Sequence, residues 1–189
     1  AVGNEPEAQV YDLWSQLVHK QINEKFWLEQ GYYADWVSDN TKYTYFSTDG
    51  NLLAILWGVA DEEKAKSILM HMEAEKLHRS FGVKTAHPQY KTSLISPINM
   101  LAGISEYHTD IRWLWISCLY TKALNENGFE LRAQSELKDI KSNIEKYGEV
   151  YEVYESDGSP VNRFFYKSEH PFAWSSGVCT WVFRELKDD

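Results

Sequence analysis

The sequence predicts an all-helical fold in which six helices form three αα-hairpins, with short β-like segments in the connections. Three observations support this prediction. Apolar residues recur at helical spacing in six segments, strongly apolar helices alternate with more polar ones, and the chain has neither a strand-rich half nor a βαβ rhythm. Such alternation is what an inner and an outer ring of helices require. The six segments are 6–24, 49–60, 61–77, 109–125, 130–147 and 172–186.

The first helix is expected to begin at Pro6, a residue that suits a first turn. Its apolar residues, Val10, Leu13, Trp14 and Leu17, fall on one stripe. The segment that follows, 26–46, is rich in aromatic residues and contains two β-like runs separated by polar residues. We expect a small hairpin or an irregular loop there.

The second helix is apolar on nearly every face, so it should be buried. Asp49 stands at its start, where its carboxylate can accept backbone N–H groups as an N-cap. Asp61 caps the third helix, which continues to about Leu77. The two helices are joined almost directly, as in an αα-hairpin.

Residues 78–107 show little periodicity and contain several prolines and glycines. Long loops of this kind are often functional in compact domains. The fourth helix follows from about Thr109, with Asp110 as an acid in its first turn. Its apolar residues lie at helical spacing, and an Asn-Gly pair ends it.

The fifth helix has a narrow apolar stripe among many charges, which is typical of an outer, solvent-facing helix. Gly148 ends it. Residues 149–155 are strand-like and lead into a turn, and the last helix follows from about Phe172 to Leu186.

The composition limits the classes of function. The 189 residues, 43% of them hydrophobic and 25% charged, are expected to form one domain spanning 1–189. A net charge of -9 argues against a nucleic-acid partner, and the apolar runs are too short to span a membrane. We expect no metal and no cofactor, because the chain has no CxxC, HExxH or Cys/His cluster. Cys118 and Cys179 are expected to be buried core residues.

No signal peptide opens the chain, so a cytoplasmic location is expected, and a start at Ala1 without Met indicates a trimmed or processed piece. Aromatic residues reach 15%, with 8 Trp and 12 Tyr. Some of them can fill a core. Others can stack on the apolar faces of sugar rings, and the sequence leaves both roles open.

Four segments, in this order, resemble the C-terminal half of the (α/α)6-barrel glycoside hydrolases. The resemblance is strongest to the amylo-α-1,6-glucosidase, or glycogen-debranching-like, and α-glucosidase group, and it covers nearly the whole chain. It implies half of an (α/α)6 toroid, whose complete form has twelve helices in two rings. The segments are DGNLLAILWGVA (49–60), YHTDIRWLW (107–115), YEVYESDG (151–158) and PFAWSSG (171–177).

The resemblance also implies an inverting mechanism with two carboxyl groups roughly 6.5–9.5 Å apart, one acid and one base. Carried onto this sequence, the position of the base is Glu152, which the residues alone would not distinguish from Glu149 and Glu155 as a solvent-facing carboxylate. The family's general acid lies in the other half of the barrel and has no match here. The chain is then a fragment of a longer enzyme, a half barrel that pairs with another, or a non-catalytic relic.

Five residues are candidates for substrate binding. The resemblance places His108 and Trp113 in a substrate segment, although Arg112 and Leu114 depart from its usual Ile and Pro. His108 could instead be a capping or partly buried histidine, and Trp113 could pack in the core. The others are a carboxylate beside an indole, which can grip a sugar, and the tryptophan that opens the last helix. These three residues are Asp35, Trp36 and Trp174, and Asp35 could instead cap or turn its loop.

Two hypotheses of function follow. The chain is the C-terminal part of an inverting α-glycosidase that acts on an α-glucoside, with a carbohydrate as its substrate. Alternatively, it is a non-catalytic helical carbohydrate-binding or interaction module. A helical repeat scaffold is disfavoured because no period of 34–45 residues recurs.

Overall fold

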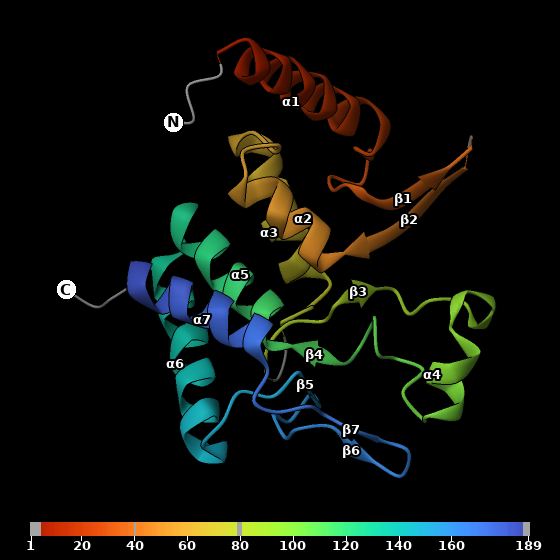
Figure 1. Ribbon diagram of the computed structural model, residues 1–189, viewed down its shortest axis with the longest axis vertical. Helices are drawn as coiled ribbons and strands as arrows, with labels where there is room; N and C mark the ends of the chain where they lie inside the picture. The colour runs from red at the N-terminus through yellow and green to blue at the C-terminus, as the bar shows by residue number, and fades with distance from the viewer. Residues whose placement is uncertain (1–4, 40, 79–80, 187–189) are drawn as a thin grey trace.

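The computed structural model describes residues 5–39, 41–78 and 81–186. The expected processing at Ala1 lies outside these ranges. Within them the chain folds into seven α-helices with short strands between them (Figure 1), which confirms the predicted helical class. The helices are α1 (Glu5–Lys25), α2 (Thr48–Leu56), α3 (Glu62–Ala74), α4 (Pro97–Leu101), α5 (Leu114–Glu126), α6 (Glu130–Tyr147) and α7 (Ala173–Glu185).

Helix α5 is the centre of the fold. It packs against α2 on one side and α7 on the other, and α6 lies against it as well. Nearly all its residues are buried, including the side chains of Tyr120 and Leu124. The three most apolar helices, α2, α5 and α7, therefore form one layer, as the predicted inner ring requires.

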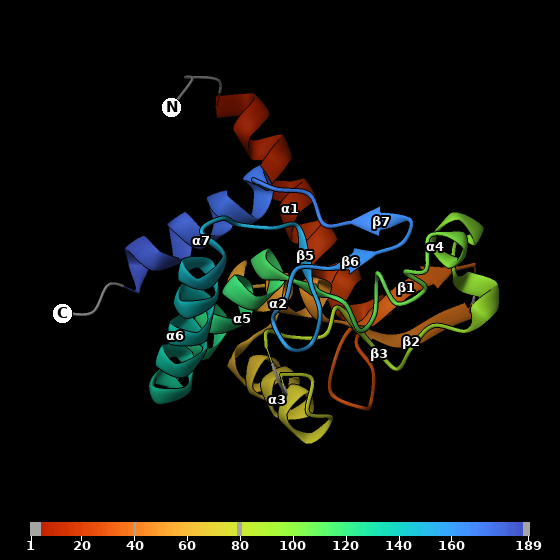
Figure 2. The same ribbon diagram turned by 90° about the horizontal axis from the view of Figure 1, so that it is seen from below.

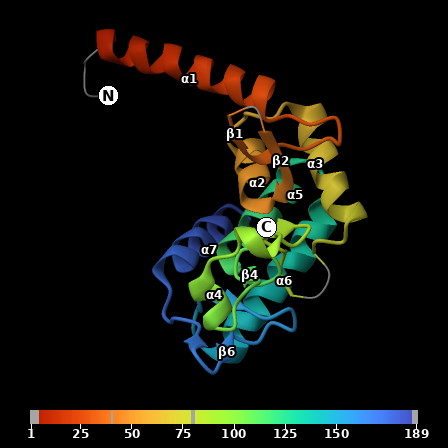
Figure 3. The same ribbon diagram turned by 90° about the vertical axis from the view of Figure 1, so that its right-hand side faces the viewer.

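The more polar helices lie outside this layer. Helix α6 buries only Ala133, Leu137, Ile140 and Asn143, and Gly148 ends it in the left-handed conformation at φ 74°. Helix α1 buries no residue. It projects from the rest of the molecule (Figure 3), and only its C-terminal end approaches α2. Its apolar stripe is therefore exposed.

The strands form three small antiparallel sheets, which lie with α4 on one side of the helical body (Figures 1 and 2). The predicted hairpin is the pair β1–β2, and β3 extends it. The strands are β1 (Ala34–Ser38), β2 (Thr41–Ser47), β3 (Ala86–His87), β4 (Arg112–Trp113), β5 (Val153–Tyr154), β6 (Asn162–Arg163) and β7 (Tyr166–Lys167).

The fourth predicted helix begins later than expected. Residues 109–113 precede α5, because Arg112 and Trp113 form β4 and pair with Tyr154 and Val153 of β5. Asp110 is therefore not a first-turn acid. It forms an ion pair with Lys84 over 2.6 Å instead.

Asp49 is not the N-cap of α2. Ser47 takes that position, and Asp49 lies in the first turn, where its carboxylate accepts a hydrogen bond from the Ser47 hydroxyl over 2.5 Å. Helix α2 is also less buried than predicted, since Trp57 beyond its end is 71% exposed. The cap predicted for α3 is confirmed, because Asp61 accepts the Lys64 N–H over 2.9 Å.

Two other predicted segments differ in detail. Residues 78–107 were expected to lack secondary structure, but the described part contains β3, the 3-10 helix η1 (Thr92–Leu94) and α4. Of the strand-like residues 149–155, only Val153 and Tyr154 pair as a strand, because the rest bond to loop residues. In the described parts of the chain, no helix is both long and apolar enough to cross a membrane.

Candidate functional site

Glu152 lies between α6 and β5, on a segment that hydrogen bonds hold in place. Its N–H donates to the carbonyl of Glu169 over 2.9 Å. The next N–H, of Val153, donates to the Ser168 hydroxyl, also over 2.9 Å. Since β5 pairs with β4, the backbone that carries the Glu152 carboxylate is tied to two other segments of the chain.

Two tyrosines hold this carboxylate, one at each oxygen. Tyr107 donates to Oε1 over 2.6 Å, and Tyr166 donates to Oε2 over 2.5 Å. Burial, followed by the hydrogen bond to Glu152, raises the pKa of both phenols, so both remain donors at neutral pH. Each carboxylate oxygen keeps lone-pair capacity beyond one phenol. The half-buried Glu152 is thus oriented and still able to accept a proton from water.

Trp113 supports the first of these tyrosines. Its indole Nε1 donates to the carbonyl of Tyr107 over 3.1 Å, and the two rings meet edge to face at 5.0 Å between centroids. Tyr107 and Tyr166 also meet edge to face at 5.7 Å. Trp113 is the N-cap residue of α5, so the central helix fixes the loop that supplies Tyr107.

The five predicted substrate-binding residues line two hollows that adjoin at Asp49, Thr85 and His108. One, of about 390 Å³, is lined by Asp35 and Trp36 among others. The second, of about 270 Å³, is lined by aromatic side chains of α5 and of the start of α7. The five are Asp35, Trp36 and His108 in the first hollow, and His108, Trp113 and Trp174 in the second.

Glu152 lines neither hollow. It connects to them through Tyr107, the neighbour of His108, and through the bond between Tyr107 and Trp113. The structure therefore gathers the five binding candidates and sets the predicted base beside them.

Asp35 and Asp49 supply two carboxylates to the first hollow. Asp35 accepts a hydrogen bond from the Tyr90 hydroxyl over 2.6 Å. Burial raises the pKa of Asp35, the bond from Tyr90 partly offsets this, and the nearby charge of Asp49 raises it further. Asp35 is on β1 and Asp49 is on α2, so the hairpin and an inner helix meet here.

His108 lies where the two hollows join. Burial lowers its pKa, and the carboxylates of Asp49 and Asp35 offset part of this effect. The imidazole is therefore held mainly neutral, and a neutral imidazole has one donor and one acceptor nitrogen for sugar hydroxyls. Its ring lies parallel to that of Trp113, at 6.5 Å between centroids.

The two other tryptophans differ in their surroundings. Trp36 stacks on Tyr43 and on Tyr45, at 4.3 Å and 6.0 Å between centroids, so its indole already has aromatic neighbours. Trp174 is 63% exposed and lies 5.6 Å from the ring of Trp115. The indole of Trp174 is thus the more accessible of the two for stacking.

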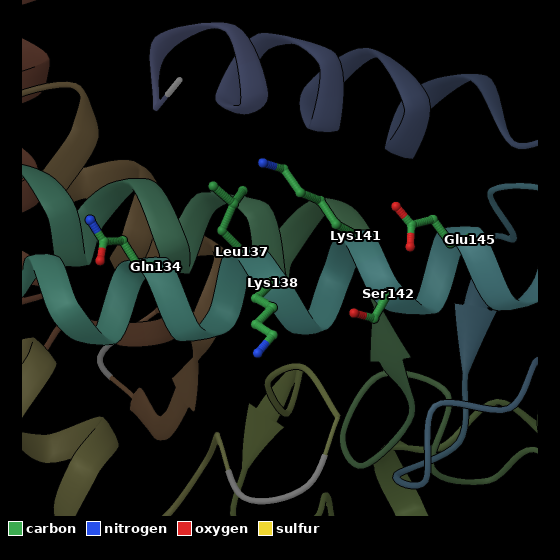
Figure 4. Close-up of a pocket in the computed structure, with 6 residues that line it drawn as sticks. All are labelled: Gln134, Leu137, Lys138, Lys141, Ser142 and Glu145. Atoms are coloured by element: carbon green, nitrogen blue, oxygen red, sulfur yellow. The ribbon is translucent and has the colours of Figure 1, made fainter. Parts of the chain in front are cut away.

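Two further hollows are lined by none of Glu152, His108 and Trp113. One of about 470 Å³ lies on α6, where the Leu137 and Lys141 side chains point towards α7 (Figure 4). An apolar one of about 340 Å³ lies between the end of α1 and α2, with Asp35 at its edge. Among the residues described, no cluster of three or more His, Cys, Asp and Glu side chains could hold a metal ion.

The sequence pointed to Tyr107 only as the residue before His108, and it missed Tyr166 and Tyr90. Tyr166 is on the short hairpin β6–β7, which has no periodic signal. Tyr90 is in the loop after β3. Their roles depend on contacts with Glu152 and Asp35 that are 14 and 55 positions away in the chain.

The fold is that of the (α/α)6 glycoside hydrolases. The structure matches neutral trehalase Nth1 from Saccharomyces cerevisiae with a TM-score of 0.62 and 16% sequence identity, over 95% of this chain and 31% of the trehalase chain. The chain therefore spans about a third of the length of that relative.

A family model described as amylo-alpha-1,6-glucosidase matches residues 2–181. The chain belongs to this family. No curated protein sequence matches it.

Proposed function

We propose that the chain is the C-terminal part of an inverting α-glycosidase that hydrolyses an α-glucoside, with Glu152 as the general base. One observation carries the proposal. The carboxylate of Glu152 is held at both oxygens by Tyr107 and Tyr166, beside two hollows lined by aromatic and polar side chains. Family membership supports the same reaction class.

In this reaction Glu152 accepts a proton from a water as the water attacks the anomeric carbon. The bond to the leaving oxygen breaks on the opposite face of the sugar, and that oxygen takes a proton from a general acid. The anomeric configuration is inverted, and one water is consumed for each bond broken. The tyrosine hydroxyls orient the carboxylate so that its free lone pairs can reach the water.

The sugar would occupy the adjoining hollows. Asp35 and the neutral His108 are suited to hydrogen bonds with hydroxyl groups, and Trp113 and Trp174 offer aromatic surface to the ring. Trp36 would line the first hollow beside Asp35. An α-1,6 linkage, as in glycogen debranching, is the finer assignment that the family suggests.

We further infer that a second half barrel completes the enzyme and supplies the general acid. The chain spans only 31% of the trehalase chain, and α1 presents apolar side chains, between 49% and 66% exposed, that find no cover among the residues described. An N-terminal half barrel would cover them, and self-association is the competing outcome. We also propose that the enzyme acts in the cytoplasm. The exposed apolar residues of α1 are Val10, Tyr11, Leu13, Trp14, Leu17 and Val18.

The test is hydrolysis of maltose and isomaltose by the product of the whole gene. Glu152→Gln is expected to lower kcat by about 10²- to 10⁴-fold while sugar binding is retained, because the amide cannot accept the proton. Glu149→Gln is the matched control. Glu149 is exposed, and among the described residues its carboxylate bonds to His170, so its amide should leave kcat unchanged. Proton NMR should show the inverted anomer first.

Near-normal turnover by Glu152→Gln would place the base elsewhere. The competing function, a non-catalytic carbohydrate-binding module, is favoured by one observation: no general acid is assigned within the described chain. If the wild-type whole-gene product binds maltose by calorimetry but hydrolyses neither sugar, that function replaces the enzymatic one.

A further inference from the structure

The two cysteines of the sequence meet inside the protein. Cys118 lies in the middle of α5, and Cys179 lies in the middle of α7. Their Sγ atoms are 2.9 Å apart, close enough for one thiol to donate to the other. The side chains are 0% and 3% exposed. Because the chain has 2 Cys in all, each is the other's nearest possible covalent partner.

Their surroundings are apolar. Leu114, Leu137, Ile140 and Val182 pack around the pair, and Tyr154 completes the cluster. Burial, with the neighbouring Cys179, raises the pKa of the Cys118 thiol, so it stays protonated in the folded protein. The thiolate is the reactive form. Burial therefore slows the oxidation of the two thiols in the folded protein. The same packing would slow the reduction of a disulfide between them.

We propose that Cys118 and Cys179 are the site of a reversible disulfide that joins α5 to α7. The oxidant is a disulfide of a small thiol, such as oxidised glutathione. Local opening of α7 exposes one cysteine, which ionises. Its thiolate then attacks the oxidant, forms a mixed disulfide and releases one small thiolate. The second cysteine thiolate attacks the protein-bound sulfur and releases the other small thiolate. Two protons pass from the cysteines to the released thiols, and the two electrons pass to the oxidant.

The geometry favours a disulfide between the two cysteines over a lasting mixed disulfide with another thiol. The sulfurs need to approach from 2.9 Å to about 2.0 Å, and helices α5 and α7 already pack together. The two residues are 61 positions apart in the chain, and the loop that the bond would close contains Glu152 and Tyr166. A covalent link across this span lowers the entropy of the unfolded chain.

The link would also fix two helices that form part of the sugar site. Trp115 of α5 and Trp174 of α7 lie 5.6 Å apart and line the second hollow. In a reducing cytoplasm the pair would be held mostly as thiols, and oxidative conditions would close the bond. The inference concerns the fold alone, so it does not depend on Glu152 acting as a base.

The experiment equilibrates the 189-residue chain with mixtures of reduced and oxidised glutathione, with and without concentrated urea. After an acid quench the chain is unfolded, alkylated with N-ethylmaleimide and weighed by mass spectrometry. We expect two alkylations in the reduced form and none in the oxidised monomer. The effective concentration of the two thiols should be about a thousandfold higher in the folded chain than in urea, as expected for a loop of this length.

Thermal unfolding gives the second readout. By thermodynamic linkage the oxidised chain should melt about 10 °C above the reduced chain. The Cys118→Ala/Cys179→Ala variant should show no dependence on the glutathione ratio. Three results would overturn the proposal. The first is an effective thiol concentration in the folded chain that is no higher than in urea. The others are glutathione adducts on the separate sulfurs, or disulfide-linked dimers in place of the oxidised monomer. None of these wild-type measurements requires the variant to fold.

Discussion

Helices α5 and α1 carry similar apolar patterns but have opposite surroundings. Helix α5 is enclosed by α2, α6 and α7, and Leu119 in it is 3% exposed. Helix α1 buries nothing, and its Leu13 is 64% exposed. Helical periodicity shows which face of a helix is apolar, but only the tertiary structure shows whether that face is buried. The difference also indicates where stability resides in this chain.

The sharpest test of the comparison is one pair of matched substitutions. Leu119→Ala should lower the free energy of unfolding by about 3 kcal/mol, because it removes buried methyl groups and leaves a cavity. Leu13→Ala should change it by less than about 0.5 kcal/mol, because the side chain is exposed and alanine suits a helix. Urea unfolding followed by circular dichroism measures both. Equal losses would mean that α1 is covered in solution, for example by a second copy.

Helix α6, which packs on α5, carries a largely buried carboxyl group that makes stability depend on pH. Burial raises the pKa of Glu136 on α6 from 4.5 to about 7, and Arg132 offsets part of the effect. The folded pKa exceeds the unfolded one, so stability is greatest below the unfolded pKa and falls as the pH rises towards 7. The total loss is about 3 kcal/mol.

Glu136→Gln should remove that loss. Compared with the wild type, the variant should gain stability as the pH rises from the unfolded pKa of 4.5 to the folded pKa of about 7, measured by urea unfolding. Glu145→Gln, on an exposed position of the same helix, should change stability by less than about 0.5 kcal/mol throughout. A stability difference for Glu136→Gln that does not vary with pH would contradict the raised pKa.

The smallest expected effect contrasts a packed glycine with an open one. Gly158 and Gly148 both have positive φ, 80° and 74°, so an alanine is strained at either. At Gly158 the new Cβ would lie 2.8 Å from Asn143 Nδ2 and 3.1 Å from the Phe81 ring, and at Gly148 it would meet nothing within 4 Å. Gly158→Ala should therefore cost about 1 to 2 kcal/mol more than Gly148→Ala. Thermal melts of the two variants measure the difference. Equal melting temperatures would show that the loop at Gly158 accommodates the new methyl group without an additional loss of stability.

The helical framework could be predicted because it depends on local patterns. The charged pattern of α6 and the cap of α3 at Asp61 were both predictable, because each signal lies within a few residues of the helix that it predicts. The start of α5 was wrong for a non-local reason, since Arg112 and Trp113 are drawn into β4 by β5, about 40 positions later. The N-cap of α2 was wrong for a local reason, because both Ser47 and Asp49 are polar residues near the start of the helix and Ser47 takes the position.

The candidate site divides in the same way. Glu152, His108 and Trp113 were found through a family resemblance, and Asp35 and Trp36 through a local pairing of a carboxylate with an indole. His108, Trp113, Asp35 and Trp36 converge on two adjoining hollows, and Glu152 lies beside them without lining either, so the roles of all five remain predictions. Tyr166 could not be found, because its significance lies in one hydrogen bond to Glu152 that only the folded chain brings about.

The two phenols that hold Glu152 come from separate connections, one after α4 and one on the β6–β7 hairpin. At the tip of that hairpin, Phe164 and Phe165 are exposed, and short surface hairpins open more readily than buried helices. Heating or mild denaturant should therefore release the carboxylate from Tyr166 while the helices remain intact. For this chain, chemical competence is a more fragile property than the fold, and a melting curve followed through the helices would overstate the temperature range in which Glu152 is correctly placed.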